Sequence, residues 1–232
     1  MSAVPALSRV ELKLLVRNRA VAVSALALPL AAGAYLAFAF PGGSDVRVWS
    51  TVIGVQVLMV LGFTVYFGAT ASLTARREDR YLKRLRSGEQ GDVAILTGLL
   101  LPLVLLSLLQ SAVLVAIAVA AGAPLPARPE VLLLAVLLGS ALCVAAGAVT
   151  SAWTSSSEHA QITTVPFFLL LVGGLVWSGL PAPVDPSGAL VDLIRAAMTD
   201  DLAAALPAAG VLLAWTAVLA VLATRTFRWS PR

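Results

Sequence analysis

Side chains that could carry out covalent or metal chemistry are scarce in this chain of 232 residues. His159 is its one histidine and Cys143 its one cysteine, so the sequence has neither a Cys/His cluster with metal-ligand spacing nor a disulfide pair. A membrane protease built on serine and histidine would need His159, which lies at the edge of a predicted loop, SSSEHAQ. The sequence also has no GxxxxGK[ST] phosphate loop. We therefore predict no enzymatic activity, no metal and no cofactor in this chain.

The densest charge lies in one stretch, TARREDRYLKRLRSGEQ, at residues 74–90. Tyr81, Leu82 and Leu85 are spaced there by three and four residues, which places them on one face of a short helix. An apolar ridge with a basic rim is typical of a helix that docks into a groove on a partner protein. Binding to anionic lipid headgroups is the alternative. The predicted docking residues are Arg80, Tyr81, Leu82, Arg84, Leu85 and Arg86.

Apolar residues dominate the rest of the chain. Hydrophobic residues make up 59% and charged residues 12%, against about 45–50% and about 25% in soluble domains. Runs of about 20 apolar residues are long enough to cross a bilayer as helices, and they lack the alternation of barrel strands. We predict an all-α integral membrane protein with one transmembrane domain over residues 1–232. Its six predicted spans are residues 20–40, 49–73, 93–121, 131–153, 160–180 and 202–224.

The distribution of basic residues predicts the orientation of these spans. Of the 16 Lys and Arg residues, all except Arg47, Arg128 and Arg195 lie before the first span, between the second and third, or after the sixth. The positive-inside rule places that side in the cytoplasm. We therefore predict a multi-pass protein of the cell membrane with both termini and a loop at residues 74–91 in the cytoplasm. The net charge of +4 follows from this topology and implies no nucleic-acid partner.

Two further segments are amphipathic. In residues 1–19, Ser8 and Glu11 have the spacing of a capping box and precede a basic stripe. This pattern predicts an interfacial helix on the cytoplasmic side, with a simple topology anchor as the alternative. In residues 181–201 we expect Ser187 to cap a short helix that rests on or dips into the outer leaflet, with an ordered loop as the alternative. Its apolar face would consist of Leu190, Leu193, Ile194, Ala197 and Met198.

The order of these segments is similar to that of a known family. The stretches ELKLLVRNRAVAVSALALP, REDRYLKRLRSGEQGDVAILTGLLLP and SSSEHAQITTVPFFLLLVGGLVWSGLP resemble the permease subunits of type-2 ABC exporters, and the resemblance covers essentially the whole chain. It implies an N-terminal interfacial helix, a coupling helix that docks on a separate ATPase subunit, and an outer re-entrant segment. It also implies two copies of that ATPase, which would hold ATP and Mg²⁺, and a second permease subunit, identical or different.

The resemblance further implies that the second and fifth spans face each other across a dimer axis. Buried Gln and Thr side chains there could equally form hydrogen bonds between helices. The residues predicted to line the substrate pathway are Gln56, Val60, Phe63, Thr64, Phe67, Thr163, Thr164, Phe167 and Phe168.

Small and helix-breaking residues occur in two of the predicted spans. Pro166 and the pair Gly173 and Gly174 could bend the fifth span. In the fourth span, Gly139 and Gly147 flank Cys143 at spacings of four residues, which would let another helix approach closely. We interpret this second pattern as purely structural.

The predicted cores of the spans contain no Asp, Glu, Lys, Arg or His, although ion-coupled carriers usually rely on such residues. Energy for transport would therefore come from a partner. We predict a subunit that exports a hydrophobic or amphipathic compound, such as a drug, antibiotic, lipid or peptide, with ATP hydrolysed by a separate subunit. The alternative is a membrane anchor or assembly factor that recruits a cytoplasmic protein through the same basic loop.

Overall fold

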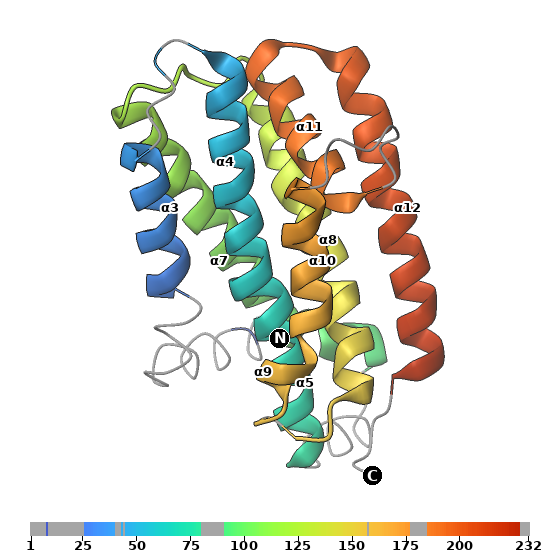
Figure 1. The fold of residues 1–232 in the computed structure, drawn as a ribbon. Helices are drawn as coiled ribbons and strands as arrows, with labels where there is room; N and C mark the ends of the chain where they lie inside the picture. The colour runs from blue at the N-terminus through green and yellow to red at the C-terminus, as the bar shows by residue number, and fades with distance from the viewer. Residues whose placement is uncertain are drawn as a thin grey trace.

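The computed structural model describes Ser8, Gly43 and residues 26–39, 45–79, 91–156, 158–176 and 185–227. These residues form helices and no strand, and the long helices run side by side in one bundle (Figure 1). The elements are α3 (Leu28–Ala39), α4 (Val46–Val60), the π-helix η2 (Leu61–Phe67), α5 (Gly68–Glu78), α7 (Asp92–Ala120), α8 (Pro129–Trp153), α9 (Ala160–Thr163), α10 (Val165–Val176), α11 (Pro186–Thr199) and α12 (Leu202–Thr226). The all-α prediction is therefore confirmed.

Among the described residues, four helical stretches are long and apolar enough to cross a membrane. They are Val46–Glu78, Asp92–Ala120, Pro129–Trp153 and Leu202–Thr226, which correspond to the second, third, fourth and sixth predicted spans. Two shorter apolar helices, Leu28–Ala39 and Ala160–Gly174, fall within the first and fifth predicted spans. Those two spans are described only in part, so a total of six stays a prediction.

The longest helical stretch joins α4, η2 and α5 without a break. Residues Val60, Phe67 and Gly68 all have right-handed helical backbone angles, so the π-helical turns are an insertion into one helix. The stretch continues to Glu78, beyond the predicted end of the second span at residue 73. Arg76 and Arg77 therefore belong to the helix itself.

The fourth span, α8, packs closely on this long helix through its glycines. A Cβ atom at Gly147 would lie 2.8 Å from the Cβ of Ala69 and 3.1 Å from the main-chain oxygen of Tyr66. A Cβ atom at Gly139 would overlap the side chain of Leu61. Cys143, between the two glycines, is buried. The structure thus confirms that this row of small residues allows close helix packing.

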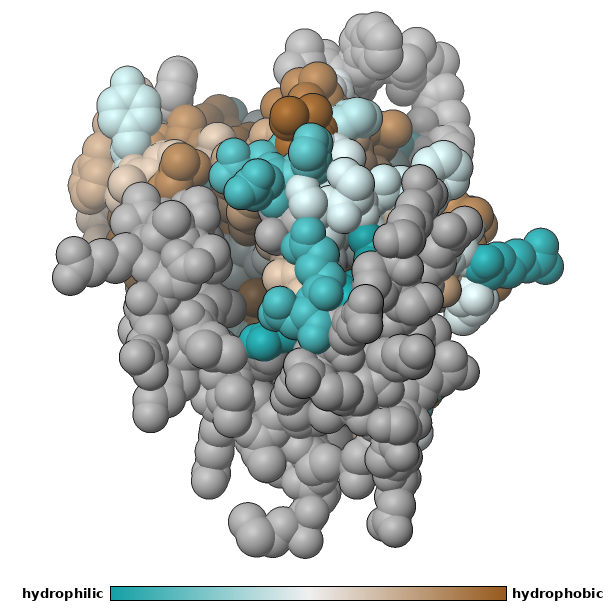
Figure 2. Space-filling model, turned by 90° about the horizontal axis from the view of Figure 1, so that it is seen from below, coloured by the Kyte–Doolittle hydropathy of each residue, from teal (hydrophilic) through white to brown (hydrophobic). Residues whose placement is uncertain are grey.

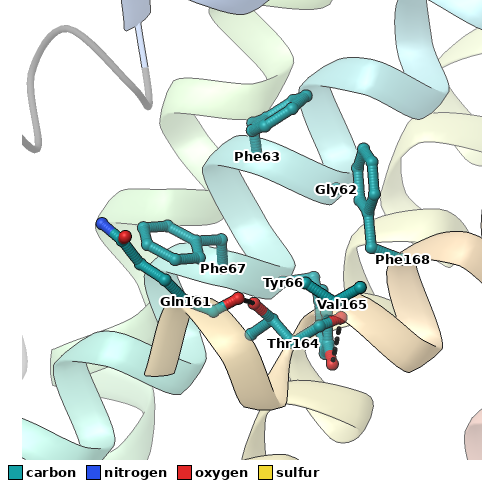
Figure 3. Close-up of a pocket in the computed structure, with 8 residues that line it drawn as sticks. All are labelled: Gly62, Phe63, Tyr66, Phe67, Gln161, Thr164, Val165 and Phe168. Carbon is teal, nitrogen blue, oxygen red and sulfur yellow. Dashed lines mark hydrogen bonds between the residues drawn. The ribbon is translucent and has the colours of Figure 1, made fainter. Parts of the chain in front are cut away.

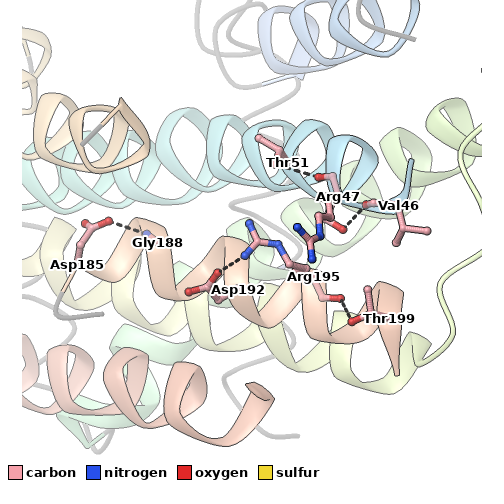
Figure 4. A network of polar contacts seen from close by, with 9 residues as sticks. Val46, Arg47, Thr51, Asp185, Gly188, Asp192, Arg195 and Thr199 are labelled. Carbon is pink, nitrogen blue, oxygen red and sulfur yellow. Dashed lines mark hydrogen bonds and ion pairs between the residues drawn. The ribbon is translucent and has the colours of Figure 1, made fainter. Parts of the chain in front are cut away.

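The segment before the sixth span forms α11, so the loop alternative is wrong. The apolar face predicted for it is buried throughout, and the helix packs against α4, α8, α10 and α12. Its N-cap is Asp185, not Ser187: the carboxylate accepts hydrogen bonds from the backbone N–H of Ser187 at 3.2 Å and of Gly188 at 2.6 Å. Asp185 takes the cap because Pro186 starts the helix at the first helical position, as prolines commonly do. Figure 4 shows this cap and the Asp192–Arg195 ion pair further along α11.

The start of α11 lies well inside the bundle. Pro186 and Ser187 share a small cavity with Leu61, Gly139 and Leu212, which belong to three different spans. In Figure 1, α10 and α11 follow one another along the bundle, and α12 then runs back beside them. The helix therefore runs from inside the bundle to the end where α12 begins. That the segment dips into the outer leaflet stays a prediction.

Candidate functional site

A cavity of about 240 Å³ lies between η2 and the helices α9 and α10. Its walls are mostly aromatic and aliphatic, and the described lining contains no charged side chain. Figure 3 shows the rings of Phe63, Phe67 and Phe168 around it, with Gln161 and Val165 at the side of α9 and α10. The lining residues are Gly62, Phe63, Tyr66, Phe67, Gln161, Thr164, Val165 and Phe168. A pocket of this composition suits an apolar or aromatic group of a ligand.

Irregular backbone on both sides creates this pocket. All the lining residues of the long helix lie in its π-helical turns, Leu61–Phe67. On the other side, the short helix α9 ends at Thr163, and α10 begins at Val165 with Pro166 in its first turn. π-helical insertions of this kind often occur at functional sites, because they change which side chains share a face.

Close ring contacts connect the two walls. The ring centroids of Phe63 and Phe168 lie 4.9 Å apart at an angle of 59°, and those of Tyr66 and Phe167 lie 4.8 Å apart at 49°. These tilted arrangements are favourable for aromatic pairs. Gly62 permits the first contact, since a Cβ atom there would lie only 2.7 Å from the ring of Phe168.

Tyr66 closes the inner side of the pocket through its hydroxyl group. The hydroxyl donates to the main-chain oxygen of Thr164 at 3.3 Å and lies 3.1 Å from the hydroxyl of Thr150 on α8. The Tyr66 side chain is fully buried, so its hydroxyl needs at least one hydrogen-bond partner, and it has two. The tyrosine therefore ties α9, α10 and α8 to the π-helical turns.

The structure places the residues predicted for the pathway in two groups. Phe63, Phe67, Thr164 and Phe168 line the pocket together, and Phe167 packs against its tyrosine. Thr163 lies beside them but turns toward α8, where its hydroxyl is 2.8 Å from that of Thr154.

The other three predicted pathway residues, Gln56, Val60 and Thr64, are fully buried on another side of the long helix. The amide of Gln56 donates to the carbonyl of Gly33 on α3 at 2.7 Å. The hydroxyl of Thr64 donates to the side chain of Gln110 on α7, also at 2.7 Å. For these two residues, the alternative of hydrogen bonds between helices describes the structure.

Sequence reasoning missed four lining residues: Gly62, Tyr66, Gln161 and Val165. Tyr66 lies three residues after Phe63, so helical spacing alone could have found it. Gln161 and Val165 depend on the interruption between α9 and α10, for which Pro166 was the available signal. Gly62 gives no signal without the ring that it accommodates.

The structure also locates two other predicted features. The docking residues Arg80, Tyr81, Leu82, Arg84, Leu85 and Arg86 lie outside the described residues, as does the N-terminal segment apart from Ser8, whose hydroxyl donates to the carbonyl of Gly98. His159 forms a local contact, with its Nδ1 atom 2.7 Å from the hydroxyl of Ser156. Among the described residues, no group of three or more His, Cys, Asp or Glu side chains could hold a metal ion.

Arg77 lies at the lower end of the bundle, close to α8. Only 6% of its surface is exposed, and its guanidinium donates to the carbonyls of Ser151, at 2.8 Å, and of Thr154. These carbonyls belong to the last turn and cap of α8, where a helix lacks internal partners and favours a positive charge. Seen from this end, hydrophilic side chains gather near the centre of the described surface, with hydrophobic ones around the edge (Figure 2).

Several long apolar helices, with an aromatic pocket beside a helix interruption, indicate a multi-pass membrane protein. A family model described as ABC-2 family transporter protein matches residues 43–225, so the chain belongs to this family. It is an ABC transporter permease, a transmembrane component that is not itself an ATPase, and its family generally works with an ATP-binding cassette partner. A comparison with curated proteins gives no significant match.

Proposed function

We propose that this permease exports a hydrophobic or amphipathic compound, with ATP hydrolysed by a separate ATPase subunit that docks at its cytoplasmic end. The pocket between η2 and α10 would bind the apolar part of the substrate. The single observation that supports this role most directly is that two interruptions of regular helix, one on each wall, meet at one aromatic pocket.

The lining of the pocket favours this substrate class. An uncharged wall of three phenylalanines and one tyrosine gives an apolar molecule a large contact area, while it offers few partners for a sugar or an inorganic ion. The half-buried rings of Phe63, Phe67 and Phe168 are also accessible to a ligand without unfolding of the core. An amphipathic molecule could leave its polar part near Gln161 at the edge.

Several parts of the assembly belong to the proposal as well. The cytoplasmic ATPase would be present in two copies, and a second permease subunit, identical or different, would complete the transporter. The basic loop after α5 would dock on the ATPase. Both termini would lie on the same, cytoplasmic side, as the positive-inside rule predicts. The start of that loop would follow Glu78 directly, at the lower end of the bundle.

Binding and export by pocket variants test this proposal. In a complex purified with its ATPase and reconstituted into liposomes, Phe63→Ala and Phe168→Ala should each weaken the binding of Nile red and rhodamine 6G about tenfold, because each removes one half of a ring pair. Fluorescence titration measures the binding, and ATP-dependent dye movement measures the export. Leu169→Ala is the matched control, since Leu169 is next to Phe168 but 61% exposed on the outside of the bundle.

Two outcomes would count against the proposal. Equal losses in the Phe168 and Leu169 variants would remove the pocket from the pathway. Purification without any ATPase, with no dye movement in the wild type, would instead favour the membrane anchor or assembly factor.

A further inference from the structure

Arg77 is the last buried residue of the long helix before the predicted docking loop, and its contacts lead toward the pocket. Its guanidinium holds the carbonyls of Ser151 and Thr154 at the end of α8. The next helix along the chain is α9, which borders the pocket through Gln161. The end of α8 thus contacts the last buried residue of the long helix and leads along the chain to the helix that borders the pocket.

Two sets of hydrogen bonds continue from the end of α8 to the pocket. The hydroxyl of Thr154 lies 2.8 Å from that of Thr163, the residue before Thr164. The hydroxyl of Thr150, one turn earlier, lies 3.1 Å from that of Tyr66, which in turn donates to the main-chain oxygen of Thr164 at 3.3 Å. The first route ends at Thr163, directly before Thr164 in the chain, and the second ends at Thr164 itself, which lines the pocket.

An arginine is well suited to this position, and a lysine is not. The planar guanidinium presents several N–H groups in fixed directions, so it can hold two carbonyls of one helix end at the same time. A lysine would keep the positive charge near the end of α8 but would act as a single point of contact. A lysine would satisfy the positive-inside rule as well as an arginine does. The contact with two carbonyls at once requires the guanidinium of an arginine.

We propose that Arg77 is a positioning residue that couples the docking loop to the pocket by fixing the last turn of α8. When an ATPase moves the loop, Arg77 moves the end of α8, and the two sets of hydrogen bonds move Thr164 and Tyr66. This inference rests on the proposed function, because it requires an ATPase at the loop. It adds the specific route by which the movement reaches the pocket.

Thiol labelling at the pocket tests this route without a known substrate. With Cys143→Ala removing the native thiol, Gln161→Cys places one cysteine at the exposed edge of the pocket. In the complex with its ATPase, we expect ATP to change the rate at which a maleimide dye labels this cysteine. Arg77→Lys should reduce that ATP-dependent change by about fivefold or more, the lower part of the range for coupling between two sites.

A second variant separates coupling from folding. Thr163→Val removes the contact with Thr154 while every charge stays in place, and it should also reduce the ATP-dependent change. Combined with Arg77→Lys, its effect should be less than additive, because both variants interrupt the same route. Thr226→Val is the matched control: its hydroxyl donates to the carbonyl of Leu222 at the end of α12, away from the route.

The result distinguishes this inference from the proposed function. Recovery of the ATPase with the purified permease tests the function, and it should stay near the wild-type level in all three variants. If the ATPase binds and ATP changes labelling equally in Arg77→Lys and the wild type, Arg77 only caps α8 and the inference is wrong. A wild-type labelling rate that ATP leaves unchanged overturns it equally.

Discussion

Arg77 and the arginines at the opposite end of the helical bundle are held in different ways. At the end where α8 and α12 begin, Arg128 pairs with Asp200 and Arg195 with Asp192, and all four side chains are 40% exposed or more. At the opposite end, Arg77 is almost completely buried and binds main-chain carbonyls of α8. Exposed ion pairs contribute little to stability because water screens them, whereas a buried cation needs its partners.

This difference suggests a division of roles along the bundle. The buried end, which carries Gly147, Tyr66 and Arg77, joins the long helix to α8 through close packing and hydrogen bonds. At the other end, called here the exposed end, the ion pairs of Arg128 and Arg195 lie at the surface. We therefore expect substitutions to cost most at the buried end and least at the exposed one.

Gly147→Ala should have the largest effect on stability. The added methyl group would meet Ala69 and the main chain of Tyr66, and main chain cannot move aside as a flexible side chain can. Overpacking of this kind typically costs about 1–3 kcal/mol. The buried thiol of Cys143 gives the measurement, since its reaction with a maleimide dye on heating reports opening of the bundle.

Gly210→Ala is the control for this prediction. Gly210 lies in α12 with no atom within 4 Å of the added Cβ, so the change should stabilise the helix by roughly 0.5–1 kcal/mol or leave it unaffected. If both alanine variants opened at the same temperature, the close contact at Gly147 would carry no strain, and the proposed difference between the two ends would lose its main support.

Sequence alone predicted the helical class and the approximate bounds of four spans, because long apolar runs leave the backbone no other way to satisfy its hydrogen bonds in a membrane. It could not predict the π-helical turns at Leu61–Phe67, since an insertion inside an apolar helix changes neither composition nor length. The small residues of α8 were interpretable because Gly139 and Gly147 lie at regular helical spacing.

The candidate site was predictable only in part, for a related reason. Aromatic residues marked the region of the pocket, so Phe63, Phe67 and Phe168 were among the residues named from the sequence. Gln56 and Thr64 were assigned to the same face, but hydrogen bonds to α3 and α7 direct them elsewhere. Polar residues in an apolar helix are predictable as buried, but their partners depend on which helix packs alongside. The burial of Arg77 depends in the same way on where α8 ends.

Asp185→Ala should have an intermediate effect. The carboxylate caps α11 and lies against Gly174 of α10. Asp185 is partly buried, so water replaces this cap less readily than a fully exposed one. Loss of an N-cap typically costs about 1 kcal/mol, and we expect Asp185→Asn to retain most of the cap. The same thiol-reactivity measurement compares these two variants.

Asp45→Ala provides the matched comparison at the exposed end. Asp45 caps α4 by accepting from the N–H of Arg47 at 2.8 Å, but it is exposed, so water can take its place. A smaller loss for Asp45→Ala than for Asp185→Ala would show that a cap contributes more inside the bundle than at its exposed end. The reverse ranking would show that α11 does not depend on its internal cap.

The smallest effect should follow from Arg128→Gln, at the loop before α8. The hydrogen bond and charge of Asp200 raise the pKa of Arg128 above its usual value, so this arginine is charged at every pH at which the protein would be handled. A raised pKa adds stability that is fully present while the pH stays below the pKa of arginine in the unfolded chain, and it is lost only as the pH rises through the folded-state pKa, in the strongly alkaline range. Because the pair is exposed to water, its contribution to stability is small, so the opening temperature of the variant should stay close to that of the wild type. The difference should be the same at neutral and at mildly alkaline pH, since Arg128 stays charged at both. The main-chain hydrogen bond from Arg128 to Ala197, at 2.9 Å, is unaffected by the substitution and still connects this loop to α11.

A clear drop in the opening temperature of the variant would contradict this prediction. Added salt should then cause a similar drop in the wild type, because salt screens the ion pair. Such a result would mean that the exposed end depends on its ion pairs as strongly as the buried end depends on Arg77.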